Sequence, residues 1–182
     1  MDCKRALAEA SGDLEQAAVI LRKQGMARAD ARMARRATEG VIASYIHADG
    51  RIGVLVEVNC ETDFVARTDE FRELARNLAM HVAAEQPRWV QPEEVPEAVL
   101  AQEQEVYRSL AQREGKPEHL LDKIVEGRLK KYFSEVCLLE QAYVRDDQKT
   151  VREVVKEAMA HLGENVVVRR FVRYQLGEEA QS

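Results

Sequence analysis

The sequence has 182 residues, with 27 Lys and Arg against 32 Asp and Glu, which gives a formal net charge of −5 at pH 7. This acidic balance argues against direct binding along nucleic-acid phosphates, because that mode needs a basic face. No apolar run approaches the roughly 20 residues that cross a bilayer, so we expect no membrane-spanning segment.

The first 25 residues predict two short helices separated by a turn at residues 11–13. Apolar side chains recur at helical spacing on both sides of this turn, Asp13 is suited to cap the second helix, and Gly25 is suited to end it. Two helices of this length bury too little surface to be stable alone. We therefore expect a partial helical module that needs a neighbouring surface.

Residues 22–36 hold six basic side chains and one acidic side chain, with alanines between them. A helix with this charge is either a docking strip for an acidic partner or a solvated connection. Surface charge runs usually carry no site, so the second interpretation is favoured. We assign residues 27–38 to a basic linker helix.

A period of two begins at Val41 and predicts a β-hairpin that turns at residues 49–50 and continues from Ile52 to Val58. Thr68 is suited to cap the helix that follows, whose apolar face should lie on this sheet. His81 lies beside that apolar face and is expected to be a satisfied histidine at the edge of the core.

Residues 93–136 predict a helical hairpin that is broken at residues 115–117. Its first arm is acidic and its second arm carries basic residues, so charges are expected to pair across it. A strand at 138–144, a helix at 150–162 that ends at Gly163, and a strand at 166–176 complete the chain.

The last strand should present apolar side chains on both faces. Alternation places one set against the helices: Val166, Val168, Val172, Tyr174 and Leu176. It places the other set on the opposite face, where a second copy of the chain could cover them: Val167, Arg169, Phe171 and Arg173. The order of these elements predicts an α+β fold, with a small helical N-terminal module followed by an antiparallel sheet packed with helices and a helical hairpin.

Sequence signatures of catalysis are missing. The chain contains no glycine-rich phosphate loop, no nucleophile elbow and no histidines paired at i and i+4, so we expect no enzyme, no cofactor and no metal. The three cysteines, Cys3, Cys60 and Cys137, are far apart and predict neither disulfides nor a zinc site. Buried structural thiols are a better interpretation than a nucleophile. The N-terminus lacks a secretory signal, so a cytoplasmic protein is expected.

The segment from Cys60 to Arg67 is a compact polar connection between the hairpin and the next helix. Thr62 can cap one helical turn with Asp63 at its first position, where a carboxylate suits the helix dipole. Phe64 can enter the core. This structural interpretation is favoured on composition alone, although connecting loops also carry function.

Eight segments in order resemble the translation elongation factor Ts family, and together they extend over nearly the whole chain. They are residues 2–7, 12–13, 51–57, 62–66, 79–83, 115–117, 125–131, and 163–165 followed by 168–171. Members normally carry a further helix ahead of the segment that starts this chain, so Met1 is expected to begin inside the N-terminal module.

The resemblance implies a ubiquitin-associated-like module at residues 1–26 and a core exchange and dimerisation domain at 39–182. It also implies guanine-nucleotide exchange on elongation factor Tu, bound with GDP or free of nucleotide. Four residues would form the contact that disturbs the partner's magnesium and phosphate site: Thr62, Asp63, Phe64 and Val65. His81, Arg51 and Gly53 are expected to support it. The chain resembles the short form of the family, which has one core unit and is associated with homodimers. An adaptor that tethers partners through the N-terminal module is the alternative.

Overall fold

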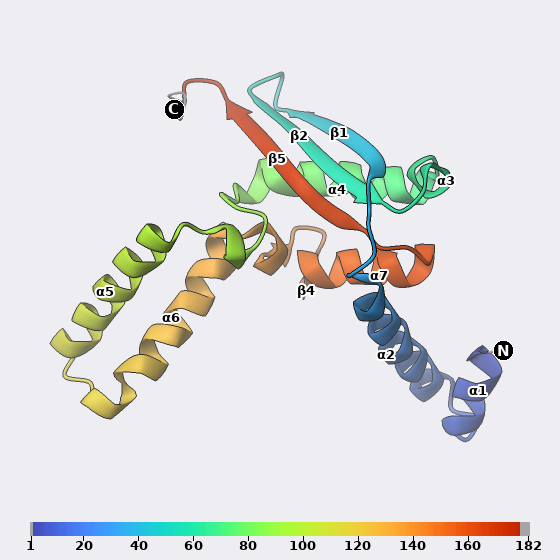
Figure 1. Ribbon diagram of the computed structural model, residues 1–182, viewed down its shortest axis with the longest axis horizontal. Coiled ribbons are helices and arrows are strands. Elements are labelled where there is room, and N and C mark those ends of the chain that lie inside the picture. The colour runs from blue at the N-terminus through green and yellow to red at the C-terminus, as the bar shows by residue number, and fades with distance from the viewer. Residues whose placement is uncertain (1, 179–182) are drawn as a thin grey trace.

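The computed structural model describes residues 2–178, so the expectation about Met1 and the last four residues of the predicted core domain lie outside the described part. The α+β prediction is confirmed (Figure 1). The principal helices are α1 (Asp2–Glu9), α2 (Leu14–Arg32), α3 (Asp63–Ala66), α4 (Asp69–Glu85), α5 (Glu97–Arg113), α6 (Leu121–Val136) and α7 (Val151–Leu162). The strands are β1 (Glu39–His47), β2 (Ile52–Cys60), β3 (Ala142–Tyr143), β4 (Asp146–Thr150) and β5 (Val167–Gln175).

The N-terminal helices differ from the prediction at Gly25. Asp13 caps α2 as expected and accepts a hydrogen bond from the backbone N–H of Gln16 at 3.0 Å, but α2 continues through Gly25 to Arg32. A side chain at position 25 would place its Cβ 3.2 Å from that of Ala160 on α7. Gly25 is therefore a point of close helix packing rather than a helix end, and the predicted boundary at residue 26 falls within one helix.

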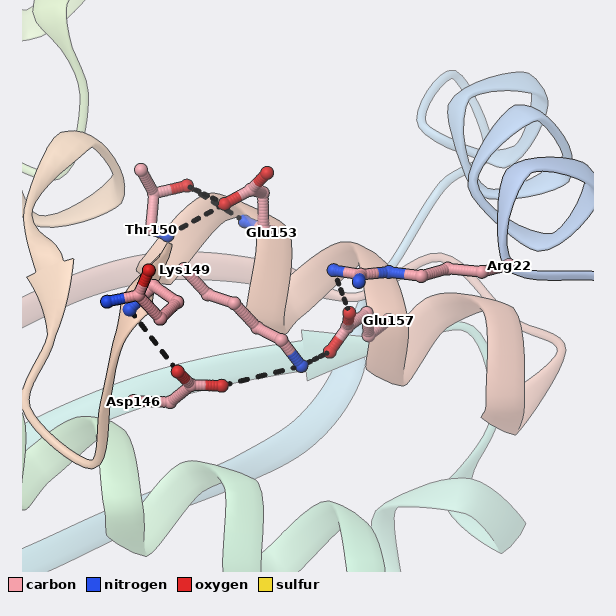
Figure 2. A network of polar contacts seen from close by, with 7 residues as sticks. Arg22, Asp146, Lys149, Thr150, Glu153 and Glu157 are labelled. Carbon is pink, nitrogen blue, oxygen red and sulfur yellow. Dashed lines mark hydrogen bonds and ion pairs between the residues drawn. The ribbon is translucent and has the colours of Figure 1, made fainter. Parts of the chain in front are cut away.

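Ion pairs accompany this contact between α2 and α7. Figure 2 shows Glu157 of α7 between Arg22 of α2 and Lys149 of β4, at 2.8 Å and 2.7 Å. Ala29 of α2 is fully buried and belongs to the main core. Much of the predicted linker helix is thus the docked half of α2. Likeness to a ubiquitin-associated module stays a prediction.

The main sheet has the strand order β1-β2-β5 and is antiparallel throughout. Val54, Val56 and Val58 alternate along β2 and are buried on one face, which α4 covers with Phe71 and Leu78. The predicted hairpin and the predicted helix on the sheet are both confirmed. Side chains on the other face, including Leu55, remain exposed.

The face assignment in β5 was wrong beyond Val168. Glu57 pairs with Arg170 whereas the next residue, Val58, pairs with Val168, so Arg169 is an extra residue in a β-bulge. One extra residue inverts the alternation that follows it. Phe171 consequently lies opposite buried Val56 and packs against the core.

The inversion exchanges the two sets of side chains in the second half of β5. Val172 and Tyr174, predicted to face the helices, lie on the open face, and the side chain of Tyr174 is 71% exposed. Arg173 lies opposite Val54 on the helix side and donates a hydrogen bond to Glu178 at 3.1 Å. Phe171 and Arg173 are therefore unsuited to the sheet-to-sheet interface for which they were named, while Val167 and Arg169 remain exposed.

The segment before α7 was also predicted incorrectly. Residues 138–140 form a 3-10 turn, and only β3 is extended in the predicted strand at 138–144. It pairs with β4, which the sequence did not predict because Asp146 to Thr150 has no strand-like pattern. Thr150 caps α7 in a full capping box with Glu153, and Gly163 ends that helix with φ 79°, as expected.

The helical hairpin of α5 and α6 extends away from the sheet as an arm (Figure 1). Arg128 donates to Glu114 across the hairpin at 2.8 Å, as expected, whereas Lys130 and Lys131 pair with Glu126 and Glu135 within α6. The expected charge pairing is thus confirmed in part. Val95, Tyr132 and Cys137 form a small core separate from the main one. Within residues 2–178, no helix is both long and apolar enough to cross a membrane.

Candidate functional site

The turn α3 presents an aromatic side chain to solvent. Phe64 is 78% exposed although it follows a buried strand and precedes a buried helix. The interpretation that Phe64 enters the core is therefore wrong. A single exposed apolar side chain is common in folded proteins. The exposure of Phe64 therefore leaves its ring available for a contact but does not by itself identify one.

Asp63 lies beside Phe64 at the first position of α3. Its carboxylate pairs with Arg67 at 2.8 Å, and both side chains are substantially exposed. An exposed pair of this kind contributes about 0–1 kcal/mol. Asp63 can therefore leave Arg67 for another cation at little cost, while its charge suits the N-terminus of the turn.

Thr62 fixes the start of α3 as predicted. Its side-chain oxygen accepts a hydrogen bond from the backbone N–H of Val65 at 3.4 Å. Val65 packs partly against the main core, and Ala66 is buried in it. Thr62 and Val65 thus anchor the turn, and Asp63 and Phe64 between them lie outermost.

A distant segment holds the same turn. Glu164 accepts hydrogen bonds from the backbone N–H groups of Glu61 and Thr62, each at 3.0 Å, and from the hydroxyl of Thr62 at 2.6 Å. A helical turn of four residues is not stable by itself, because helix nucleation is unfavourable. The presentation of Phe64 therefore depends on contacts from outside α3.

His81 does not reach the surface. It is fully buried, accepts from the backbone N–H of Val144 through Nδ1 at 3.2 Å, and donates through Nε2 to Gln141 at 3.0 Å. The expected satisfied core histidine is confirmed. In this position His81 supports the packing of α4 against the chain around β3 and makes no surface of its own.

Burial lowers the pKa of His81 below its ordinary value of 6.5, against smaller opposing effects of Gln141 and Glu85. Between the two pKa values the unfolded chain binds a proton that the folded chain does not, so the free energy of unfolding should fall as pH decreases from about 6.5. His81→Gln should remove this part of the pH dependence, measured by urea unfolding between pH 7.5 and 5.5.

The control for this experiment is His119→Gln, because His119 is an exposed histidine on the arm. The control should keep the wild-type pH dependence. If the free energy of unfolding depends on pH equally in the wild type and in His81→Gln, a titration at His81 is contradicted.

Arg51 and Gly53 lie at the opposite end of β2 from α3. Nine residues of strand separate the two ends, which is about 27 Å. Arg51 is exposed in the hairpin turn, and Gly53 pairs with Ile46 and Tyr174 on the neighbouring strands. The structure therefore brings residues 62–65 together but places these supporting candidates on a separate surface.

Comparison with known proteins decides the family. The sequence model described as Elongation factor TS matches residues 15–178. Proteins named Elongation factor Ts from Coprothermobacter proteolyticus, Moorella thermoacetica and Thermotoga neapolitana are 55%, 56% and 56% identical to this chain; each alignment includes 98% of the chain and 88–90% of the relative. The chain belongs to the elongation factor Ts family. Membership supports a role as a translation elongation factor and confirms the resemblance that the sequence indicated.

The two buried cysteines of this elongation factor Ts family member are not activated. Cys60 and Cys137 are fully buried, and burial raises the pKa of each thiol to about 11. A thiol is nucleophilic as its thiolate, so neither group is poised for attack at neutral pH. Among residues 2–178, no group of three or more His, Cys, Asp or Glu side chains is arranged to hold a metal ion.

Sequence reasoning missed the role of Glu164 in this elongation factor Ts site. The residue lies in one of the segments that resemble the family, yet it is 102 residues from Thr62, and no local pattern pairs the two. Glu61 was missed for the same reason: its carboxylate accepts the backbone N–H of Asn165 at 2.6 Å. Each residue is a carboxylate in a short connecting segment, which is too common a pattern to identify a contact.

Proposed function

We propose that this protein is a guanine-nucleotide exchange factor that promotes GDP release from elongation factor Tu in the cytoplasm. It acts by binding, not as an enzyme, and uses no cofactor. The observation that carries the proposal is the exposed Phe64 beside Asp63 on a capped turn in a chain of the elongation factor Ts family. An aromatic wedge and an adjacent carboxylate suit a site that holds phosphate and a divalent cation.

The exchange factor accelerates release through differential affinity. It binds the nucleotide-free partner more tightly than the GDP-bound partner, and reciprocity requires that it weaken GDP by the same factor. Phe64 enters the partner's nucleotide domain and separates packed side chains near the magnesium site. Asp63 exchanges its exposed contact with Arg67 for contacts in the partner and opposes the negative phosphates by charge.

Phe64 cannot supply the whole effect. Full burial of one Phe contributes about 1.5–3 kcal/mol, or roughly tenfold to a hundredfold in an equilibrium constant. A second contact must add binding free energy, and the N-terminal helices together with the hairpin turn at Arg51 and Gly53 offer surfaces separate from α3. A two-part contact lets one surface hold the partner while the other opens its nucleotide site.

The decisive experiment measures fluorescent GDP leaving elongation factor Tu after mixing with excess unlabelled nucleotide, with increasing amounts of this protein. An exchange factor raises the observed release rate to a plateau. An adaptor binds the partner, as seen by sedimentation, without changing the release rate, and that result would contradict the proposal.

We also propose that the protein is a homodimer joined through the open face of its main sheet. Exposed apolar side chains lie on this face across all three strands: Ile42, Ile46, Leu55, Val172 and Tyr174. The helix α4 covers the opposite face. A patch of this kind can pair with its own copy under two-fold symmetry.

A further inference from the structure

We propose that Glu164 is a positioning residue for nucleotide exchange: it holds the turn that presents Asp63 and Phe64. This inference rests on the proposed exchange function and extends it to a residue that does not touch the partner. Glu164 follows the Gly163 cap at the end of α7, and its side chain reaches the chain between β2 and α3.

The carboxylate of Glu164 uses both oxygens on the turn. Oε2 accepts the backbone N–H groups of Glu61 and Thr62 at 3.0 Å each, and Oε1 accepts the hydroxyl of Thr62 at 2.6 Å. Hydrogen bonds to an ionised acceptor are stronger than neutral ones. Three of them fix the backbone immediately before Asp63.

The contact with the hydroxyl also orients the cap of α3. Because Thr62 donates its hydroxyl proton to Glu164, a lone pair of the same oxygen is left to accept the backbone N–H of Val65. The cap distance of 3.4 Å is long, so the cap alone holds the turn weakly. Glu164 thereby adds the constraint that the cap lacks.

A second carboxylate, that of Glu61, joins the same two segments from the other side. Glu61 accepts the backbone N–H of Asn165 at 2.6 Å, and the buried side chain of Asn165 donates to the carbonyls of Met33 and Arg35 at 3.3 Å and 2.7 Å. Three chain segments therefore meet at one point: the start of α3, the α7–β5 turn and the segment after α2. We call these contacts of Glu164, Glu61 and Asn165 the clamp, and residues 62–65 the exchange turn. The clamp connects the end of α2 to the exchange turn.

The clamp affects exchange because residues 62–65 must be ordered before Phe64 can enter the partner's nucleotide domain. A loosened α3 would fold against the partner only at a cost in conformational entropy, which reduces the fraction of productive encounters. If separate surfaces hold the partner first, this cost slows the opening step itself. The rate at saturation is then the quantity that Glu164 controls.

The test compares Glu164→Ala, Glu164→Gln and a matched control, Glu153→Ala, in the fluorescent GDP release assay. Glu153 lies at the other end of α7, where its carboxylate likewise accepts a backbone N–H, that of Thr150, at 2.8 Å. We expect Glu164→Ala to lower the plateau rate about tenfold. Glu164→Gln keeps an acceptor for the backbone N–H groups and should lose about threefold, whereas the control should stay within twofold of wild type.

The plateau separates positioning from a general loss of folded protein. Partial unfolding lowers the active concentration and moves the half-saturating concentration, but it leaves the plateau unchanged. Glu164→Ala should instead lower the plateau with less than a threefold change in the half-saturating concentration. An unchanged plateau for Glu164→Ala, with an active wild type, would overturn the proposal.

Amide hydrogen exchange tests the clamp without the partner. In Glu164→Ala the amides of Glu61, Thr62 and Val65 should lose protection, while those of core residues such as Val56 and Leu78 keep it. Unchanged protection of the three turn amides would also overturn the clamp. If the wild-type protein leaves the rate of GDP release unchanged, the proposed function itself is wrong. If the wild type is active and Glu164→Ala is equally active, only the positioning role of Glu164 is wrong.

Discussion

Replacing both Asp63 and Phe64 with alanine is expected to lower the stimulated rate of GDP release from elongation factor Tu at least a hundredfold. The loss follows from removing an exposed aromatic wedge, about 1.5–3 kcal/mol of potential burial, together with the neighbouring charge. The fold should be preserved, because Phe64 is 78% exposed and Asp63 makes only an exposed pair with Arg67. Thermal unfolding should shift by less than about 3 °C.

The matched control is Glu105→Ala with Val106→Ala on the arm. These residues are also an adjacent acid and apolar pair, and Val106 is 44% exposed. The control should stimulate GDP release from elongation factor Tu at the wild-type rate. Separate substitutions of Asp63 and Phe64 should each cost less than the pair, and a double-mutant cycle should show coupling because the residues are neighbours. A double variant with full activity would contradict the wedge mechanism.

Leu55→Glu is expected to convert the protein from a dimer to a monomer. Leu55 lies on the central strand β2, opposite Ser44 and Val172 on its two neighbours, and is 47% exposed on the open face. In a two-fold interface centred on this strand, the new carboxylate meets its own symmetry copy, an arrangement that costs several kcal/mol when desolvated. A stable interface needs about 1,000 Å² of buried area, which a three-stranded face can provide.

Sedimentation at micromolar concentration measures this outcome. Wild-type protein should have a mass near twice 20.7 kDa, and Leu55→Glu a mass near 20.7 kDa. Val106→Glu on the arm should remain dimeric, because it adds a charge at a similarly exposed apolar site outside the sheet. Reducing agent should change nothing, since Cys60 and Cys137 are buried and the exposed Cys3 lies on α1, outside the sheet. A monomeric wild type at high concentration would contradict the dimer but leave the exchange mechanism intact.

Local chemistry made much of the fold predictable from sequence. Thr68 and Thr150 cap helices where they were expected, and Gly163 ends one. Apolar alternation correctly assigned the buried face of β2. These signals act within a few residues, because caps and alternation depend on the backbone groups and side chains nearest to them.

The errors arose where distant segments decide the structure. Glycine is the residue type that often ends a helix, yet α2 continues through Gly25, where it packs closely on Ala160 of α7. The extra residue at Arg169 inverts the second half of β5, and its position depends on pairing with β2. For the site, Thr62 and Asp63 were predicted from local rules, whereas the exposure of Phe64 and the contact of Glu164 depend on tertiary packing.

The arm formed by α5 and α6 joins the sheet domain through two chain segments that lie side by side. The backbone N–H of Leu138 donates to the carbonyl of Trp89 at 2.9 Å, and that of Leu139 to the carbonyl of Val90 at 3.0 Å. Beyond this junction the arm relies on its own small core. Evolution can therefore lengthen or shorten the arm by matched helical turns, and so change its reach toward other molecules, while the exchange turn keeps its geometry.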